Sequence, residues 1–356
     1  GNYNVAMGTD TFSSNTTGAN NTAIGWQSLV AATTANDNTA LGFQAGAALT
    51  TGEDNVAIGS DSLLVCTTGA RNVAIGYNAL KATTTGGGAT GHIAIGVNAL
   101  VAKTTDYGAG QNIGIGDHSL TSCTTGYRNT AVGGMHEGGQ GALKNVTTGA
   151  MNCGFGLAAG YSITTASNNV AIGAFSMETA TTGIDNICIG YAADVSATGS
   201  TDQIVMGNGV TGNANDSFVI GNGATDSAIA FGGTSVTAPS DIRLKEDIQD
   251  EVVGLDFINQ LRPVTFRWKK EKDVPKDMVT YKADSEERVM NGKYNHGFIA
   301  QEVKEVIDNT PNLKEGFDMW SEDDADGRQR IGDGALVPML TKAIQELSAK
   351  VEDLEK

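Results

Sequence analysis

Proline and charged residues are scarce in the first two thirds of the sequence, and both become common after residue 240. All five prolines lie at or beyond Pro239, whereas 40 of the 47 glycines precede residue 241. Residues 1–240 hold 5 Lys and Arg against 14 Asp and Glu, and the last 116 residues hold 18 against 26; the differences, −9 and −8, sum to the net charge of −17. This break predicts two physically different regions that meet near residue 240.

Long apolar runs, basic clusters and paired cysteines are also lacking. There is no stretch of about 18 apolar residues to span a membrane, and no signal peptide heads the chain. Both regions are acidic, which argues against nucleic acid as a partner because phosphate binding needs Lys and Arg. No CxxC pair occurs, so we expect buried small hydrophobic thiols rather than disulfides or metal ligands, and neither metal nor cofactor is predicted. The four cysteines are Cys66, Cys123, Cys153 and Cys188.

A short motif recurs twelve times between residues 4 and 207. It reads Asn, a β-branched or small residue, Ala, a large aliphatic residue and Gly, with spacings of 17 residues except for two of 20 and one of 23. The chain begins with Gly1 only three residues before the first motif, which is typical of a fragment of a longer protein. The motifs start at Asn4, Asn21, Asn38, Asn55, Asn72, His92, Asn112, Asn129, Asn152, Asn169, Asn186 and Gln203.

Each repeat is expected to form a short strand, a bend and a turn. Alternation within the motif favours a strand whose large aliphatic residue, such as Ile24, points to the core. A second apolar residue such as Leu29 often follows five residues later, and a Thr-Thr pair marks the turn. One repeat cannot bury its apolar face alone, so the repeats must stack, at about 4.8 Å each, into a rod of roughly 55 to 60 Å.

Some repeat positions admit two interpretations. The recurring Asn either forms a ladder of side-chain amide hydrogen bonds or reflects plain turn preference, and the closing Gly is expected to allow a positive φ. Extra residues in the longer repeats are either tolerated surface loops or a lateral recognition surface with Tyr107, His136 and Glu137 as contacts. The acidic residues are scattered, so a glycosidase pair is not indicated within one chain, although one could be assembled between chains. Beyond Gln203 the period shortens.

The repeats resemble two groups of fibrous proteins. They are similar to the heads of trimeric autotransporter adhesins, whose NxAIG-type repeats wind a left-handed β-roll in each of three chains. They also resemble the NTAIG repeats of many phage tail-fibre proteins. The resemblance covers residues 4–207, but the 17-residue period is longer than the usual adhesin coil. Whether each chain forms its own solenoid or three chains intertwine therefore stays open.

The last region carries a second resemblance, through SDIRLKEDI (240–248), GLDFINQLRPVTFRW (254–268), HGFIAQEV (296–303) and the helical C-terminus. These segments resemble the intramolecular chaperone, or auto-processing, domain that ends phage endosialidases and many tail fibres and spikes and recurs in the myelin regulatory factor family. The resemblance implies a homotrimer that templates the folding of the fibre ahead of it and then cuts itself off. The serine and lysine of that reaction map to Ser240 and Lys245.

This assignment makes chemical sense. A lysine serves as general base for a serine hydroxyl if burial lowers its pKa from about 10.4. Attack on the carbonyl of Pro239 through a five-membered ring gives an ester that water hydrolyses, which favours cleavage at Pro239/Ser240 over Ser240/Asp241. Residues five apart lie on different faces of a strand or helix, so Ser240 must sit outside the element of Lys245 or use a lysine of another chain. Without the resemblance, Ser240 or Asp241 reads as a helix cap and Lys245 as solvated.

Four further residues of the family motifs are candidates for supporting roles. His296 could orient the dyad or polarise the scissile carbonyl, but a histidine before Gly297 is as easily a packing or turn residue. Gln301 and Glu302 match the motif without an assigned role. They begin a helix with an apolar side.

The C-terminus predicts a short coiled-coil helix. Pro338 suits a first helical turn. The residues after it repeat apolar side chains in a 4-3-4-3 pattern, with Ile and Val at a and Leu at d, which by rule favours a dimer. The resemblance implies a trimer, and we adopt the trimer. The seam consists of Leu340, Ile344, Leu347, Val351 and Leu354.

The expected fold is therefore mainly β. A trimeric β-solenoid or β-roll rod (1–207) and a tapering β junction (208–239) precede a smaller α+β chaperone domain (240–356), which ends in a coiled-coil helix (338–356). Because near-identical coils can pair in many registers, a trimerising domain that fixes the register and is then removed makes physical sense.

The expected function is that of a phage tail fibre for host attachment, assembled in the host cytoplasm and carried in the virion. Its C-terminal domain would act as a single-turnover self-cleaving serine endopeptidase. The expected partners are two further copies of the chain, a host cell-surface receptor such as a glycan or outer-membrane component, and other tail proteins, without nucleic acid or membrane insertion. A polysaccharide-depolymerising tail spike with the same chaperone, or a bacterial trimeric adhesin head, is the alternative.

Overall fold

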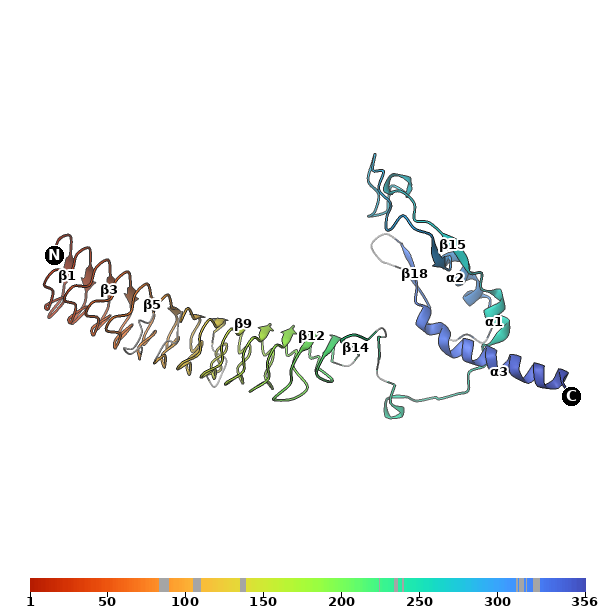
Figure 1. The fold of residues 1–356 in the computed structure, drawn as a ribbon, viewed down its shortest axis with the longest axis horizontal. Helices are drawn as coiled ribbons and strands as arrows, with labels where there is room; N and C mark the ends of the chain where they lie inside the picture. Colours follow the sequence, from red (N-terminus) through yellow and green to blue (C-terminus); the bar gives the residue numbers. More distant parts are fainter. Residues whose placement is uncertain are drawn as a thin grey trace. The chain divides into compact units, whose positions relative to one another are not determined.

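The computed structural model divides into two compact units, Gly1–Asp241 and Ile242–Lys356. The first unit is a β-solenoid, and the second combines α-helices with small sheets (Figure 1). The described residues of the second unit form three α-helices and two two-stranded sheets. The described residues are 1–82, 90–104, 110–134, 139–223, 225–233, 236–238, 240–311, 313, 317, 319–322 and 327–356.

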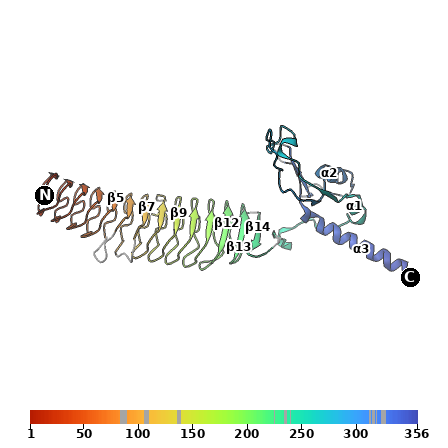
Figure 2. The same cartoon turned by 45° about the horizontal axis from the view of Figure 1, so that its top comes forward.

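The solenoid carries one strand per coil, and a single chain winds the whole stack. Strands β1 to β13 pair in sequence order, each parallel to the next, with equivalent motif positions in register (Figure 2). Ala23 thus pairs with Ala40 across β2 and β3. The strands of the first eleven coils are β1 (Val5–Met7), β2 (Thr22–Ile24), β3 (Thr39–Leu41), β4 (Val56–Ile58), β5 (Val73–Ile75), β6 (Ile93–Ile95), β7 (Ile113–Ile115), β8 (Thr130–Val132), β9 (Cys153–Phe155), β10 (Val170–Ile172) and β11 (Ile187–Ile189).

The stack changes at its C-terminal end. β12 (Gln203–Gly207) and β13 (Ser217–Gly221) are longer than the strands before them and still pair in parallel. β14 (Asp226–Ala230) runs antiparallel to β13 and closes the sheet. The reversal ends the solenoid shortly before the junction with the second unit.

Alanine from the strands and leucine from the following bend fill the solenoid core. Ala23 is fully buried, as are Leu80 and its equivalents in other coils. The large aliphatic residue of the motif faces outward instead: Leu41 is 45% exposed and Ile172 is 39% exposed. Our expectation that this residue points to the core is wrong. Neighbouring strand residues point to opposite faces, and because Asn and Ala occupy the inner face, the aliphatic residue is left outside.

The recurring Asn forms the side-chain ladder. Asn55 Nδ2 and the Asn55 backbone N–H both donate to Asn38 Oδ1 at 3.0 Å. Asn55 Nδ2 also donates to two backbone carbonyls. The buried amide thus provides these carbonyls with the hydrogen bonds that water would otherwise supply. His92 stands in for Asn in one coil, where its Nδ1 accepts from the Asn112 N–H at 3.1 Å.

The bend of each coil requires left-handed backbone. Gly42 has a φ of +139°, and a Cβ there would lie 2.7 Å from the carbonyl of Gly59 in the next coil. Only glycine fits such a position without strain. The core leucines of the bend also have positive φ, for example +49° at Leu29 and +51° at Leu80, which is uncommon for bulky residues. The sequence analysis did not foresee this second left-handed position.

The second unit is built from helices and antiparallel strand pairs. Its helices are α1 (Leu255–Gln260), α2 (Ala300–Asp308) and α3 (Leu336–Leu354), with Pro338 in the first turn of α3 as expected. The strands form antiparallel pairs, β15 (Val264–Phe266) with β16 (Asn295–Gly297) and β17 (Trp320–Glu322) with β18 (Gln329–Ile331). Helix α1 packs onto the C-terminal helix α3, and α2 packs onto the β17 and β18 pair. Single 3-10 turns occur at η1 (Ile242–Leu244), η2 (Glu271–Asp273) and η3 (Asp333–Ala335). The buried core consists of Val253, Phe257, Leu261, Val303, Met319, Leu336 and Met339.

α3 also fixes the start of α1. The Leu255 N–H donates to Glu346 Oε2 at 2.9 Å, which satisfies one of the free donors at the N-terminus of α1. A Cβ on Gly254 would lie 2.8 Å from the same carboxylate. A side chain at this position would therefore displace the Glu346 carboxylate that caps α1.

Candidate functional site

The predicted serine and lysine lie on an exposed segment at the boundary between the two units. Ser240 precedes η1, and both Ser240 and Lys245 are exposed. The Lys245 N–H donates to the Ile242 carbonyl at 3.2 Å and closes the turn. Ser240 thus lies outside the turn that leads into Lys245, an arrangement that the five-residue spacing requires of a dyad within one chain.

Four of the sequence-predicted residues lie outside the described residues. One is Pro239, which carries the carbonyl of the favoured scissile bond. The others are Tyr107, His136 and Glu137 in the insertions of the solenoid. Asp241, on the other candidate bond, is described and partly buried.

The strand pair β15 and β16 positions His296. It sits opposite Thr265, with its Nδ1 3.3 Å from the Thr265 hydroxyl, and its side chain is exposed. Gly297 beside it pairs with Val264. The ladder thus fixes the backbone of the histidine, while its ring stays accessible.

Glu302 anchors α2 to the segment that follows α1. The Arg262 guanidinium grips its carboxylate in a forked ion pair, with Nε 2.9 Å from Oε2 and the second nitrogen on Oε1. This hydrogen-bonded partner lowers the pKa of Glu302 and raises that of Arg262. The pair lines a pocket with Leu261 and Val306. Gln301, its neighbour, lines an adjoining pocket on the same helix. Sequence reasoning flagged Glu302 but did not identify Arg262 as its partner, because the two are 40 residues apart.

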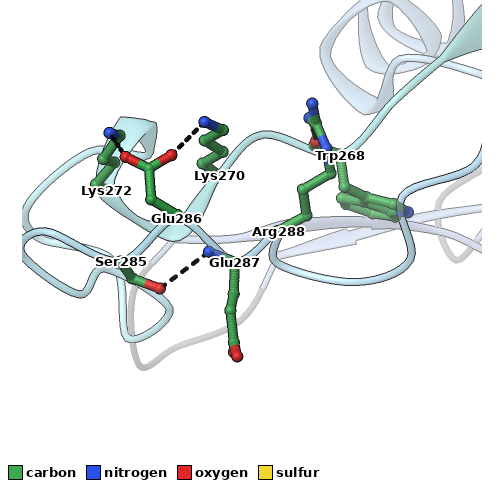
Figure 3. Close-up of polar contacts among 7 residues, drawn as sticks. All are labelled: Trp268, Lys270, Lys272, Ser285, Glu286, Glu287 and Arg288. Atoms are coloured by element: carbon green, nitrogen blue, oxygen red, sulfur yellow. Dashed lines mark hydrogen bonds and ion pairs between the residues drawn. The ribbon is translucent and has the colours of Figure 1, made fainter.

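A second ion-pair cluster lies in the long connection between β15 and β16 (Figure 3). The carboxylate of Glu286 accepts hydrogen bonds from both Lys270 and Lys272, which lowers its pKa to about 2. The Arg288 side chain reaches the backbone carbonyl of Trp268. These groups are largely exposed, so each pair contributes little to stability. The sequence analysis did not single out this cluster, since isolated lysines and glutamates carry no pattern.

Two apolar surfaces of the second unit are left uncovered in the single chain. On α3, Leu336, Met339 and Ala343 face the core, whereas the whole predicted seam from Leu340 to Leu354 is exposed. In the segment before α1 the apolar side chains are exposed too, at Ile242, Leu244, Ile248 and Val252. Contiguous exposed apolar residues of this kind mark interaction surfaces.

The four cysteines lie in the solenoid. None of them forms a disulfide among the described residues. Cys66, Cys123 and Cys188 are buried as expected, and burial together with Asp194 raises the pKa of the Cys188 thiol. Cys153 lies on the outer strand face and is only partly buried. Over the part of the chain that the structure describes, no cluster of three or more His, Cys, Asp or Glu side chains is arranged around a metal site.

Of the helices in the described part of the chain, none has the length and apolar character that crossing a bilayer requires.

Comparison with known proteins identifies the class of the second unit. Residues 240–310 match the model of a peptidase family described as chaperone of endosialidase. The matched segment starts at Ser240 and runs past the end of α2, so it contains Lys245, His296, Gln301 and Glu302. No curated protein and no solved structure matched the chain. The similarity of this segment to a peptidase family favours self-cleavage in general. Together with the β-solenoid ahead of it, the segment fits a tail fibre or tail spike that carries a C-terminal chaperone.

Proposed function

We propose that the chain is part of a phage tail fibre whose second unit assembles three copies, sets the register of the solenoid and then releases itself by Ser240/Lys245 autoproteolysis. One observation carries the proposal above the others: the chaperone match begins at Ser240, on an exposed segment between the two units. A protease site at that point separates the solenoid from the unit that follows it and leaves both intact.

The exposed seam of α3 supports self-association, and the number of three copies follows from the resemblance to the chaperone domain. Its apolar side chains repeat every three to four residues on a helix face beside the one that carries the core residue Met339. A single chain leaves this stripe in water, and self-association through a coiled coil buries it. The exposed apolar residues in the segment before α1, such as Ile242 and Leu244, add to the surface available to neighbouring copies.

The solenoid offers a second surface for assembly. Its strands turn Val, Ile, Leu and Thr outward at two positions per coil, which gives a continuous ladder of aliphatic side chains along the sheet. Such a face is typical of a sheet that packs against another sheet. Because every coil presents nearly the same face, the solenoid alone does not specify its register, and the second unit supplies it.

The proposed reaction needs only groups of this chain and water. The Ser240 hydroxyl attacks the Pro239 carbonyl carbon while its proton passes to the Lys245 amine. The Pro239–Ser240 amide bond breaks as the Ser240 nitrogen takes up a proton, which leaves an ester between the Pro239 carbonyl and the Ser240 oxygen. Water then hydrolyses the ester and restores the serine. A lysine acts as a base at neutral pH only out of solvent. We therefore place the reaction after assembly, when neighbouring chains cover this exposed segment.

His296 and Glu302 act as positioning residues in this scheme. The β15 and β16 ladder holds His296 at a fixed backbone position, and the fork with Arg262 holds Glu302 and thereby α2. The released solenoid remains in the virion as the part that attaches to the host cell surface. It contacts other tail proteins at one end.

Denaturing electrophoresis and fragment masses test the proposal. The wild-type chain should yield two fragments, the second beginning at Ser240, whereas Ser240→Ala and Lys245→Ala should stay intact. Ser285→Ala and Lys276→Ala are matched controls of the same residue types in the second unit, and both should cleave as wild type does. An intact wild-type chain, or cleavage that persists in Ser240→Ala, would refute the self-cleavage.

A further inference from the structure

One edge of the solenoid carries a column of exposed aromatic side chains near its N-terminal end. The residue after the motif glycine is Trp26, Phe43, Ser60 and Tyr77 in four successive coils. The three aromatic residues are 40%, 49% and 51% exposed. Aromatic side chains of this size are costly to leave in water, so an exposed column of them indicates a surface that contacts something else.

The backbone fixes the four positions one above another. The carbonyls of Trp26, Phe43 and Ser60 each accept a hydrogen bond from the following coil, at 2.9, 2.9 and 3.1 Å. The Trp26 and Phe43 rings stack with centroids 4.8 Å apart and planes 21° from parallel. One coil therefore corresponds to one ring of the stack.

Ser60 interrupts this column and leaves a gap between Phe43 and Tyr77. By register these two residues are two coils apart, about twice the spacing of the Trp26 and Phe43 rings. A ring inserted between two aromatic rings needs about 4.5 to 7 Å from each centroid, or roughly 9 to 14 Å in total. Two coil steps fall within this range, and the column places only the small side chain of Ser60 between the two rings.

A column of polar side chains lies directly beside the aromatic one. The next residue in the same coils is Gln27, Gln44, Asp61 and Asn78. Gln44 Nε2 donates to Gln27 Oε1 at 3.0 Å, which leaves the Gln27 nitrogen and the Gln44 oxygen without a protein partner among the described residues. Lys81 Nζ lies 3.0 Å from both Asp61 Oδ2 and Asn78 Oδ1, so the charge of Asp61 is compensated.

This combination selects one class of ligand. A sugar ring presents C–H groups on its faces, which pack on aromatic rings, and hydroxyl groups on its rim, which pair with amide donors and acceptors. Nucleic acid bases also stack, but the first 240 residues carry 14 acidic against 5 basic residues and would repel the phosphates. A folded protein partner does not enter a gap that is one ring thick.

We propose that the gap over Ser60, between Phe43 and Tyr77, binds one sugar ring of a bacterial surface polysaccharide, with Trp26 extending the platform to a neighbouring sugar. The proposal rests on the host-attachment role given above and names its ligand class and its residues. Tyr191 offers an internal comparison. It occupies the same motif position and is 56% exposed, but its polar-column neighbour is Ala192.

Binding of the fibre to an array of purified lipopolysaccharides and capsular polysaccharides tests the proposal. Wild type should bind at least one glycan, and Phe43→Ala or Tyr77→Ala should weaken that binding about tenfold or more. Ser60→Phe, which fills the gap, should abolish it. Tyr191→Ala is the matched control and should bind as wild type does, and all variants should keep the wild-type native mass and thermal midpoint.

Three outcomes would overturn the site. The wild type binds no polysaccharide; the gap variants bind as well as Tyr191→Ala; or they change the number of chains in the fibre, which would make this edge a contact between copies. Adsorption to whole cells, measured on the same variants, separates the two levels of the proposal. Adsorption that is unaffected by Tyr77→Ala and Ser60→Phe refutes the sugar site but not host attachment. Absence of adsorption by the wild type refutes host attachment itself.

Discussion

The two units find partners for their hydrogen-bonding groups in opposite ways. In the solenoid, a residue usually finds its partner at the same position of the next coil, as Asn55 does with Asn38. In the second unit, the important partners lie far apart in sequence, as Leu255 does from Glu346. A structure built from neighbour contacts can grow in either direction and slip by whole coils. A structure built from distant contacts forms in one arrangement or not at all, which suits it to set the register of the first.

The largest difference should appear when one rung of the Asn ladder is removed. Asn55→Ala strands the Asn72 amide and several bend groups in a buried site, so we expect a loss of about 3 to 5 kcal/mol in stability of the solenoid. Thermal unfolding followed by circular dichroism measures it. Asn208→Ala, at an exposed Asn of the same unit, should change the midpoint little. Equal effects of the two substitutions would mean that the ladder is dispensable.

Substitutions on the two faces of α3 should separate folding from assembly. Met339→Ala opens a cavity in the small core of the second unit, at a cost of about 2 to 4 kcal/mol. Leu347→Ala lies on the exposed face of the same helix and should leave the fold of the single chain intact while weakening association. Denaturant titration and light scattering read the two effects. If Leu347→Ala leaves association unchanged, the exposed seam is not part of the trimer interface.

A third substitution tests the left-handed bend of the coils. Gly76 has a φ of +129°, and a Cβ there would lie 2.5 Å from the carbonyl oxygen of Gly96. Gly76→Ala should therefore destabilise the solenoid by about 2 kcal/mol or more. Gly134→Ala is the control, because a Cβ on Gly134 meets nothing within 4 Å. Equal calorimetric midpoints for the two variants would contradict this packing.

The smallest expected effect is the loss of stability when acid protonates Glu286. Lys270 and Lys272 lower the pKa of Glu286 to about 2, from an ordinary value of 4.5. A lowered carboxyl pKa stabilises the fold above the unfolded value, and this contribution disappears as the pH falls from 4.5 through about 2. Carboxyl carbon NMR should show a Glu286 midpoint well below the ordinary value of 4.5. A midpoint near 4.5 would mean that the ion pairs do not persist in solution.

Much of the solenoid follows from the sequence, because a fixed period forces equivalent residues into register. The coil, the single parallel strand and the Asn ladder all rest on repetition. The sequence did not predict which strand residues face the core. Hydrophobicity placed Ile24 and Leu41 inside, but the strand alternates and the buried positions are taken by Asn and Ala, so the aliphatic residues face outward. The positive φ of Leu29 could not be read either, since nothing in its chemistry favours that conformation.

In the second unit, the sequence located elements rather than contacts. Pro338 and the apolar periodicity placed α3 to within a few residues. The fork between Arg262 and Glu302 depends on how α1 and α2 meet in space, which no local pattern encodes. Ser240 and Lys245 were predicted only through the resemblance of their motif to a known domain. Their composition alone reads as a solvated turn, which is also how the single chain presents them.

Native mass spectrometry of the uncleavable Ser240→Ala chain tests most directly whether the second unit assembles the fibre. We predict a species of three chains, and a single chain when Ile344→Asp is added to place a charge on the exposed seam of α3. A single folded chain without the second substitution, or three chains that persist with it, would contradict assembly through the second unit.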